Sequence, residues 1–484
     1  MLTADRMAAV DANAAALGVP RKQLMESSGN AVARVVRDHV DPDGRVVLIC
    51  GRGNNGGDAV VAARFLAAYA TETVLLGKPD QIRTEIAREN WAALQEAELP
   101  TTVAGDTTDI DALDLDDADL LVDAMLGTGV TGALREPEAS AARAINAADT
   151  QVISVDVPSG IDADTGTAAG VAVDADHVVT FHDTKPGLAD LDTELTVADI
   201  GIPAAAERFV GPGDIQQGGL QPGDRDAASH KGDHGELLVI GGGPYTGAPA
   251  LAARAALRTG ADLVHVACPE PVAAQIQGYS PNLIVHHFGG EGFTPGVVDS
   301  LVDLAAGMDG VICGPGVGDD DATRETVATF LAAFDGRAVV DADALAVIPD
   351  VETRATLVCT PHQGELVEMG GETADEWARR AKLVGRFAEE LGHTLLVKGP
   401  YDIVADDAET RINRTGNPGM TVGGTGDVLA GVVGALLTTH EPRAAAACGA
   451  YLTGRAGDLA FDDTGNSLVA TDVIERLPEA FEHE

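Results

Sequence analysis

The sequence has few cysteines, few lysines and no long apolar run. Its five cysteines are scattered over 484 residues and none belongs to a Cys-x-x-Cys pair. This spacing argues against a disulfide framework or a zinc ribbon and predicts buried, reduced thiols. No stretch reaches the roughly eighteen apolar residues that cross a bilayer, and the first ten residues lack the apolar core of a signal peptide. We therefore expect a cytoplasmic protein with no membrane partner.

Basic residues are scarce beside acidic ones. Lys and Arg number 32 against 76 Asp and Glu, which gives a formal net charge of −44. Such a surface disfavours nucleic acid, because phosphates need cationic neutralisation. Self-repulsion also opposes compaction unless salt screens it, and the Debye length falls to about 3 Å near 1 M salt. The acidic residues are spread over the whole chain, so we expect adaptation to a salt-filled cytoplasm, as in extreme halophiles, which would make the chain haloarchaeal-like.

The chain alternates short apolar strands with helical segments, which predicts parallel sheets covered by helices on both faces. Residues 1–38 predict two helices that are broken near Gly18-Val19-Pro20. The strands expected next are Arg45–Cys50, Thr73–Leu76, Leu120–Ala124, Val152–Val155 and His177–Phe181. Helices expected among them include Ala59–Ala70, Gln81–Glu96 and Ala139–Ala148.

Glycine and proline interrupt this pattern between about residues 205 and 232 and predict a linker. The alternation then resumes, and the expected strands are Leu237–Ile240, Leu263–Ala267, Val311–Cys313, Ala338–Asp341 and Leu395–Lys398. Two Ala-rich helices, Asp427–Leu437 and Ala444–Ala460, close the chain. We therefore expect two α/β domains, residues 1–205 and 228–484, joined by a linker over residues 206–227.

The loop Gly51-Arg-Gly-Asn-Asn-Gly-Gly-Asp58 joins the first strand to a helix, where backbone N–H groups can face an anion. Its glycine spacing also matches the dinucleotide fingerprint of dehydrogenases. That interpretation lacks its usual acidic residue, because Leu75-Leu76-Gly77-Lys78 ends the second strand. Two more loops, Val122-Asp-Ala-Met-Leu-Gly-Thr-Gly-Val-Thr-Gly132 and Val155-Asp-Val-Pro-Ser-Gly-Ile-Asp162, follow strand ends, where α/β sheets bind ligands. Their oxygen-bearing side chains suit a hard cation, although Asp123 and Asp156 could instead cap turns.

The three loops together resemble the epimerase domain of the NAD(P)H-hydrate repair family, over residues 1–205. The resemblance implies a Rossmann-like three-layer domain, a potassium ion held by Asn55, Asp123 and Ser159, and help from Asp156 in proton transfer at C6 of the substrate. Hydrate contacts are implied for Asn54, Asn55, Gly56, Gly57, Asp58, Gly127, Thr128, Gly129, Val130, Thr131, Gly132, Ala133 and Asp156. Thr184 stands where the family commonly has proline, and the neighbouring Lys185 is either a site contact or a surface turn residue.

No Gly-x-x-x-x-Gly-Lys-Ser/Thr motif occurs, which excludes a P-loop NTPase. A different phosphate-binding segment, Asn417-Pro-Gly-Met-Thr-Val-Gly-Gly-Thr-Gly-Asp427, runs directly into an apolar helix. Its glycines let several N–H groups and the helix dipole face one anion. The carboxylate of Asp427 is positioned to accept a proton from a hydroxyl that attacks a phosphoryl group.

This segment resembles the ribokinase-like superfamily. Four further segments, Val239-Ile-Gly-Gly-Gly243, Cys313-Gly-Pro-Gly-Val-Gly318, Thr360-Pro-His-Gln-Gly-Glu365 and Lys398-Gly-Pro-Tyr-Asp402, extend the resemblance to the ADP/ATP-dependent NAD(P)H-hydrate dehydratases. Hydrate contacts are then implied for Ala248, Gly316, His362 and Asp427. Nucleotide contacts are implied for Lys398, Gly399, Pro400, Tyr401, Asp402, Asn417, Gly419, Thr421, Gly423, Gly424, Thr425 and Gly426. His362 remains open to a purely structural role in its turn, and Lys398 to a structural salt bridge.

The two resemblances imply one pathway of metabolite repair. The first domain would interconvert the R and S hydrates of NADH and NADPH, and the second would dehydrate the S form with ADP or ATP and Mg²⁺. Phosphorylation of the C6 hydroxyl, with Asp427 as base, would turn it into a leaving group. The alternatives are a ribokinase-like small-molecule kinase and an N-terminal domain that only binds nucleotide. The expected partners are these small molecules and further copies of the chain in a homo-oligomer.

Overall fold

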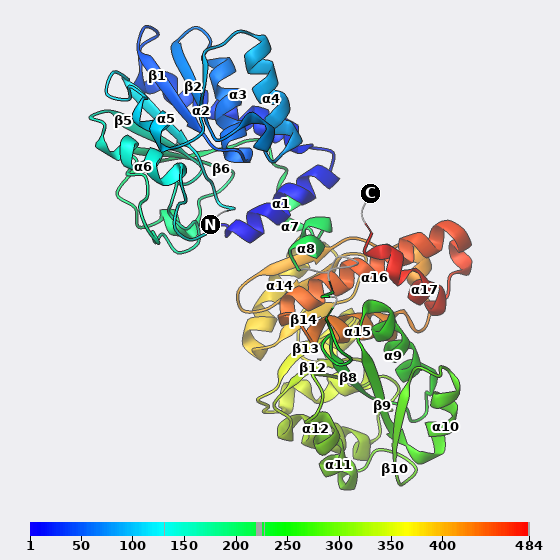
Figure 1. The fold of residues 1–484 in the computed structure, drawn as a ribbon. Helices are drawn as coiled ribbons and strands as arrows, with labels where there is room; N and C mark the ends of the chain where they lie inside the picture. The colour runs from blue at the N-terminus through cyan, green and yellow to red at the C-terminus, as the bar shows by residue number, and fades with distance from the viewer. Residues whose placement is uncertain (130, 219–224, 227, 483–484) are drawn as a thin grey trace. The chain divides into compact units, whose positions relative to one another are not determined.

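The computed structural model describes residues 1–129, 131–218, 225–226 and 228–482. The chain forms two compact units, Met1–Ala206 and Glu207–Glu484, each with its own sheet (Figure 1). All five cysteines are free and buried, as the sequence predicts. Within the described residues, no helix is both long and apolar enough to span a bilayer.

The first unit contains a seven-stranded parallel sheet in the order β3-β2-β1-β4-β5-β6-β7. Its strands are β1 (Arg45–Cys50), β2 (Ala70–Leu76), β3 (Thr101–Ala104), β4 (Leu120–Ala124), β5 (Gln151–Val155), β6 (His177–Phe181) and β7 (Glu194–Ala198). Its helices are α1 (Ala4–Ala16), α2 (Arg21–His39), α3 (Asn54–Phe65), α4 (Glu85–Glu96), α5 (Thr107–Asp111) and α6 (Glu138–Ala147), and α7 (Ala204–Arg208) includes the boundary between the two units.

Alternation along β1 divides the core of this unit into two layers. Val46 and Leu48 pack with side chains from α1 to α4, whereas Val47 and Ile49 face the layer that includes Ile145 of α6. Successive side chains of a strand point to opposite faces, so a strand buried on both faces has to be apolar throughout. The expected three-layer α/β fold is confirmed.

The second unit contains a nine-stranded sheet in the order β10-β9-β8-β11-β12-β13-β14-β15-β16, parallel except for the pairings of β15. Its strands are β8 (Glu236–Ile240), β9 (Leu263–Pro269), β10 (Ile284–Phe288), β11 (Gly310–Cys313), β12 (Arg337–Val340), β13 (Thr356–Cys359), β14 (Thr394–Val397), β15 (Asp402–Ala405) and β16 (Thr410–Asn413). Its helices are α8 (Pro212–Gln217), α9 (Gly247–Thr259), α10 (Glu270–Gly278), α11 (Val298–Ala305), α12 (Asp321–Ala333), α13 (Gln363–Glu368), α14 (Trp377–Leu391), α15 (Thr425–Leu437), α16 (Pro442–Thr464) and α17 (Ala470–Ala480).

Two apolar clusters again lie on the two faces of the sheet. One joins Leu237 and Val239 to α9, α15, α16 and α17, and the other joins Leu238 and Ile240 to helices that include α12 and α14. Helix α15 lies very close to α9, since a Cβ added at Gly431 would be 2.1 Å from the Ala252 carbonyl oxygen. This close approach anchors the glycine-rich start of α15 to the core.

Several predicted boundaries are wrong at glycine-rich and edge segments. Helix α3 begins at Asn54 and ends at Phe65, not at Ala59 and Ala70, because the two glycines of its first turn resemble a loop in the sequence. The edge strands β7 and β10 were not predicted, since β7 is largely exposed, β10 is only partly buried, and neither has a continuous apolar run. Edge strands of this kind have little of the apolar pattern on which prediction depends. Strands β3, β13, β15 and β16, each of four residues, were also not predicted.

Part of the segment expected as a linker is packed into the second unit. Val210 and Ile215 are buried in its core, and Val210 N donates to the Ile412 carbonyl. Arg411 Nη2 lies 2.9 Å from Asp214 Oδ1, with both side chains largely buried. The glycines and prolines here therefore mark turns in the chain. The part of the segment that includes Val210 and Ile215 belongs to the second unit.

Candidate active sites

The turn from β1 into α3 requires glycine at two positions. A Cβ at Gly51 would lie 1.8 Å from the Met125 carbonyl oxygen, and one at Gly56 would lie 2.0 Å from the Gly51 carbonyl oxygen. Gly53 is the N-cap of α3 and, because it has no side chain, no capping hydrogen bond occupies the N–H groups of the helix start. The predicted contacts Asn54, Asn55, Gly56 and Gly57 therefore form the first turn of a helix, and Asp58 follows it. Gly57 N donates to the Gly53 carbonyl, so the free N–H groups that attract an anion precede Gly57.

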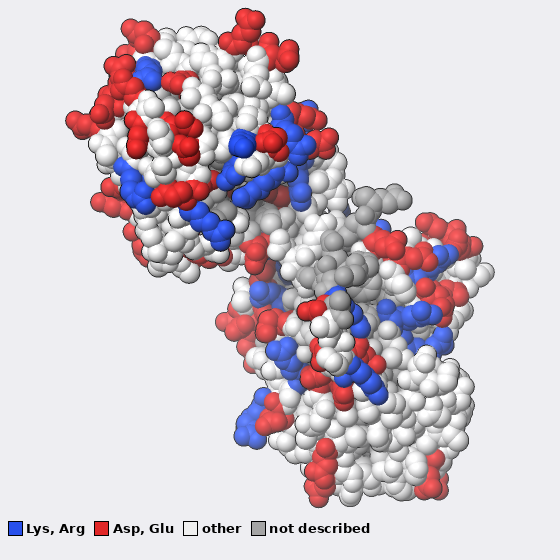
Figure 2. All heavy atoms as spheres, in the orientation of Figure 1, with Lys and Arg blue, Asp and Glu red and all other residues white. Residues whose placement is uncertain are grey.

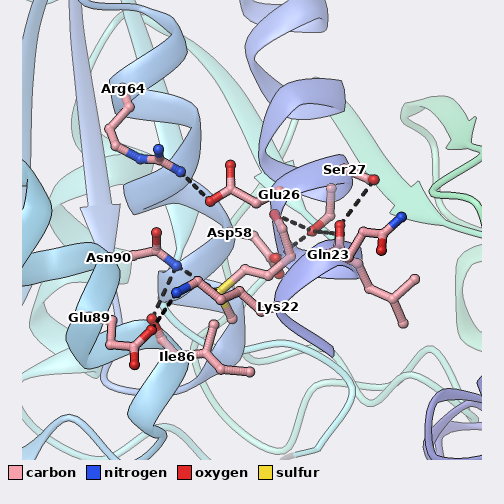
Figure 3. A network of polar contacts seen from close by, with 12 residues as sticks. Lys22, Gln23, Glu26, Ser27, Asp58, Arg64, Ile86, Glu89 and Asn90 are labelled. Carbon is pink, nitrogen blue, oxygen red and sulfur yellow. Dashed lines mark hydrogen bonds and ion pairs between the residues drawn. The ribbon is translucent and has the colours of Figure 1, made fainter. Parts of the chain in front are cut away.

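Asp58 differs from its neighbours in this turn because its side chain contacts α2. Ser28 Oγ donates a hydrogen bond to Asp58 Oδ1, and both residues are buried. Figure 3 shows Asp58 beside α2, within a polar network that includes the Lys22–Glu89 and Arg64–Glu26 ion pairs. Burial raises the pKa of Asp58 well above its usual value. The described contacts of Asp58 therefore fasten α2 to α3.

Asp123, at the end of β4, is fully buried and accepts four hydrogen bonds. Ser159 donates from both its backbone N, at 2.8 Å, and its Oγ, at 2.6 Å. Ser154 Oγ donates at 2.8 Å and Met125 N at 3.2 Å. Burial raises the pKa of Asp123, while these hydrogen bonds oppose the shift. Two of the three predicted potassium ligands, Asp123 and Ser159, are thus in direct contact.

The third predicted ligand, Asn55, has an unusual side chain. Its Oδ1 and Nδ2 are buried and have no hydrogen-bond partner among the described residues. A Cβ at Gly127 would lie 3.2 Å from Asn55 Cγ and 3.3 Å from Asp156 Oδ2, so these three residues meet. Buried amides are normally hydrogen-bonded, so this one is available to a ligand. Of the remaining loop residues, Thr128 is partly buried, Gly129, Thr131, Gly132 and Ala133 are exposed, and Val130 lies outside the described residues.

Asp156 follows β5 in a left-handed conformation, with φ 67°. Its Oδ1 lies 2.8 Å from Lys185 Nζ and accepts a hydrogen bond from Thr180 Oγ1 at 3.2 Å. The Lys185 side chain is only 1% exposed and also donates to the Phe181 carbonyl. Lys185 is therefore a buried partner of Asp156 and not a surface turn residue. Strained non-glycine residues of this kind concentrate at functional sites.

In the second unit, the predicted phosphate segment leads into α15. Gly424, with φ 97°, is the N-cap of that helix, and Asp427 stands in its first turn. The polar side chains of the segment are bonded within the protein: Asn417 Nδ2 donates to Asp458 Oδ1, Thr421 Oγ1 to the Pro418 carbonyl and Thr425 Oγ1 to the Met420 carbonyl. The segment therefore presents backbone N–H groups, chiefly around Gly423, Gly424 and Gly426, as its donors for an anion.

Lys398 connects this helix start to a second buried carboxylate. Its Nζ lies 2.8 Å from Asp341 Oδ1, and a Cβ at Gly426 would be 3.5 Å from the same Nζ. Burial alone would lower the pKa of Lys398, but Asp341, Glu365 and Asp427 together raise it. Burial and the charge of Asp341 raise the pKa of Asp427 to about 7, while Lys398 opposes them. The salt bridge predicted as an alternative for Lys398 thus exists beside the predicted base.

The other residues predicted for this site differ in their contacts and in their exposure. His362 is the N-cap of α13: its Nδ1 accepts from Glu365 N at 3.0 Å, and its side chain is 60% exposed. Asp402 accepts from Gly399 N and from Asn413 Nδ2, so it supports the loop that also carries Pro400. Tyr401 stacks on Trp377. Gly316, with φ 70°, packs against the Tyr245 backbone, near the start of the helix that contains Ala248.

Comparison with known proteins identifies the family. The NAD(P)H-hydrate dehydratase family matches residues 237–479, and the YjeF-related protein N-terminus family matches residues 21–187. The chain is 42% identical to the bifunctional NAD(P)H-hydrate repair enzyme Nnr of Pyrobaculum aerophilum, over 99% of this chain and 97% of that protein. It belongs to the bifunctional NAD(P)H-hydrate repair enzyme family.

Other relatives agree with this family. The repair enzyme Nnr of Archaeoglobus fulgidus is 41% identical over 98% of this chain and 97% of its own length. The ADP/ATP-dependent NAD(P)H-hydrate dehydratase of Bacillus subtilis, co-crystallised with ATP and Mg²⁺, superposes with a TM-score of 0.50. It is 26% identical and covers 57% of this chain and 99% of its own. The predicted family and ribokinase-like fold of the second half are confirmed.

Two residues of these sites were missed by sequence reasoning. Asp341 was treated only as the end of a strand, although a carboxylate directly after a buried strand was the signal used for Asp123 and Asp156. Thr180 lies inside the apolar strand β6 and gave no signal, because only the fold brings it to Asp156 and Lys185.

Proposed function

We propose that the chain repairs hydrated NADH and NADPH at two separate sites, an epimerase in the first unit and a nucleotide-dependent dehydratase in the second. The observation that carries the proposal is the group formed by Asp427, Lys398 and Asp341 at a glycine-rich helix start. A base of raised pKa beside a fixed cation and free N–H groups suits phosphoryl transfer from ADP or ATP.

In the dehydratase reaction, the Asp427 carboxylate accepts the proton of the C6 hydroxyl. The hydroxyl oxygen forms a bond to the terminal phosphorus of the nucleotide, and the bond from that phosphorus to the bridging oxygen breaks. The C6–O bond of the ester then breaks, phosphate leaves with the bonding pair, and the ring nitrogen lone pair stabilises C6. Loss of a proton from C5 restores the double bond.

The nucleotide contacts divide between two segments. The backbone N–H groups around Gly423, Gly424 and Gly426, at the end of the segment that begins at Asn417, would hold the phosphates, and Lys398 would offset their charge. Mg²⁺ bound with the nucleotide would neutralise charge that develops on the phosphoryl oxygens. Ala248, Gly316 and His362 would contact the hydrate, with the exposed His362 Nε2 side facing it. Gly399, Pro400, Tyr401 and Asp402 would contact the nucleotide from the other side of Lys398.

In the epimerase reaction, Asp156 would exchange a proton with the substrate close to C6, and Lys185 would hold its carboxylate in place. The backbone N–H groups of Asn54 and Gly56 would face the phosphates of the hydrate, with the loop Gly127–Ala133 on the opposite side. A potassium ion held by Asn55, Asp123 and Ser159 would supply a fixed positive charge for that anion. The unpartnered Asn55 amide supports this assignment.

The acidic surface belongs to the proposal. On the face drawn in Figure 2, acidic side chains are dispersed over each unit with Lys and Arg between them. We propose that the protein works in a cytoplasm rich in potassium salt, as in haloarchaea, where screening suppresses self-repulsion. Self-association into a homo-oligomer belongs to the same proposal and is tested by light scattering in molar KCl.

The deciding experiment uses the purified S epimer of hydrated NADH at high KCl. The dehydratase regenerates the absorbance of reduced nicotinamide only when ADP or ATP is present. A small-molecule kinase would instead accumulate a phosphorylated product without that absorbance. The R epimer, supplied alone with nucleotide, should also be consumed completely if the first unit is an epimerase. If the first unit only binds nucleotide, the R epimer should persist.

A further inference from the structure

Two histidines and a glutamate meet at the amino ends of strands β6 and β7. His177 and Glu194 are the first residues of these strands and are paired in the parallel ladder, while His39 is the last residue of α2. One ligand atom of each residue lies within 4.8 Å of the others, and no second such group occurs among the described residues. The strands of this sheet begin here, so the cluster lies at the opposite end from Asp156 and the turn into α3.

The spacing of the two imidazoles suits a tetrahedral metal ion. His39 Nε2 lies 3.3 Å from His177 Nδ1. Zinc–nitrogen bonds of about 2.0–2.1 Å at a tetrahedral angle place two nitrogens about 3.3 Å apart. Glu194 Oε2 lies 3.8 Å from His177 Nδ1, and because its side chain is 70% exposed it has room to move closer. Two imidazoles and one carboxylate leave a fourth position for water.

The far nitrogens of both rings have hydrogen-bond partners. His39 Nδ1 lies 2.8 Å from the Val35 carbonyl, which can only accept, so in a neutral ring the lone pair of His39 is on Nε2 and faces His177. His177 Nε2 lies 2.9 Å from Thr196 Oγ1, which can accept its proton. Metal-binding histidines usually donate their second N–H in this way, which fixes the ring and its tautomer.

A second histidine pair provides a contrast: His265 Nδ1 lies 2.8 Å from His286 Nε2, which is an ordinary hydrogen-bond distance and too short for two nitrogens on one zinc ion.

We propose that His39, His177 and Glu194 form a binding site for a divalent transition metal, for which zinc suits the ligand set. The ion would join the end of α2 to the edge of the sheet at β6 and β7. Helix α2 also holds Asp58 through Ser28, and β6 provides Thr180 beside Asp156. The ion would therefore stabilise the two elements that support the first active site. This proposal does not depend on the repair function.

The test measures zinc binding by the chelator-treated full chain in molar KCl. We expect one equivalent of Zn²⁺ to bind and to raise the thermal transition of the first unit, whereas Mg²⁺ should do neither. Glu194→Gln, at an exposed position that should not disturb the fold, should weaken binding at least about tenfold. Thr196→Val should weaken it by about 10–100-fold through loss of the outer hydrogen bond. His265→Gln is the matched control and should leave binding unchanged.

A measurement on the unmodified chain avoids any substitution at the buried His177. X-ray absorption of the zinc-loaded, unmodified chain should show two imidazole ligands with oxygen in a four-coordinate shell. Absence of stoichiometric binding overturns the proposal. So does a shell with fewer than two imidazoles, or an affinity that both Glu194→Gln and Thr196→Val leave unchanged. In each of these cases His39 and His177 form only a hydrogen-bonded pair.

Discussion

Lys185 Nζ lies 2.8 Å from Asp156 Oδ1, and the lysine side chain is 1% exposed. An ammonium so deeply buried is costly unless a carboxylate accompanies it, and Asp156 in turn has a left-handed backbone. The pair therefore fixes both the position and the charge of the carboxylate that follows β5. The chain has only six lysines, which favours a specific role for each of them, but only the structure shows that Lys185 is paired with Asp156.

Lys185→Met should destabilise the first unit and impair epimerisation. Removing one partner of a buried pair leaves an uncompensated charge and typically costs about 3–5 kcal/mol. Chemical denaturation measures the loss, and chromatography of the two epimers measures the rate. Lys22→Met, which removes an exposed partner of Glu89, is the control and should change little. Unaltered stability in Lys185→Met would mean that the pair contributes nothing to this fold.

Asn55→Ala should abolish stimulation of epimerisation by potassium without unfolding the first unit, because the Asn55 amide has no described partner to lose. Asp123→Ala should instead also lower the thermal transition, since it leaves four donors without their acceptor. Dehydration of the S epimer should persist in both variants. Gln95→Ala, at an exposed position of α4, is the control. A potassium response that survives in Asn55→Ala would remove this residue from the ion site.

Asp427→Asn should slow dehydration by about 10²–10⁴-fold, since it keeps the shape of the side chain and removes the base. Nucleotide binding, followed by calorimetry, should remain, because backbone N–H groups hold the phosphates. Epimerisation in the first unit should also continue at its normal rate. Near-normal regeneration of NADH would refute the assignment of the base, and loss of nucleotide binding would make Asp427 a structural residue.

The dehydratase rate should fall on the acid side of about pH 7. The pKa of Asp427 is raised to about 7, and only its ionised form can accept a proton, so kcat/KM should drop about tenfold for each pH unit below that value. Lys398 lowers this pKa, and Lys398→Gln should therefore move the acid limb to higher pH. An acid limb of the kcat/KM profile that does not move in Lys398→Gln, or that lies below about pH 5, would contradict the assignment of Asp427 as the titrating base.

Folding and both activities should require molar KCl or NaCl, because a net charge of −44 needs screening. Circular dichroism during a salt titration and the two assays measure this requirement. Sodium chloride should restore folding as well as potassium chloride does, whereas epimerisation should still respond specifically to potassium. A sharp thermal transition together with full activity in about 0.1 M salt would exclude adaptation to high salt.

The sequence by itself determined the fold class, the family and most core strands, and it predicted where the two sites lie. Strands such as Arg45–Cys50 and His177–Phe181 were predicted with their observed bounds, because strands buried on both faces are mostly apolar. The segment that ends at Asp427 could be recognised in the sequence, because a helix start that binds phosphate needs several glycines close together along the chain. Features of this kind are local, and a sequence records them directly.

Only the tertiary structure decided which side chains meet. Asp58 was grouped with the hydrate contacts, but its described contact is with Ser28 on another helix. Lys185 and His362 each had two possible roles; the fold buried the first against Asp156, while the second caps a helix through Nδ1 and keeps its side chain 60% exposed. Asp341 and Thr180 lie in the candidate sites because the sheets bring together strands that are separated in the sequence. Partnerships between distant residues depend on how the sheet is assembled, and no local pattern of residues encodes them.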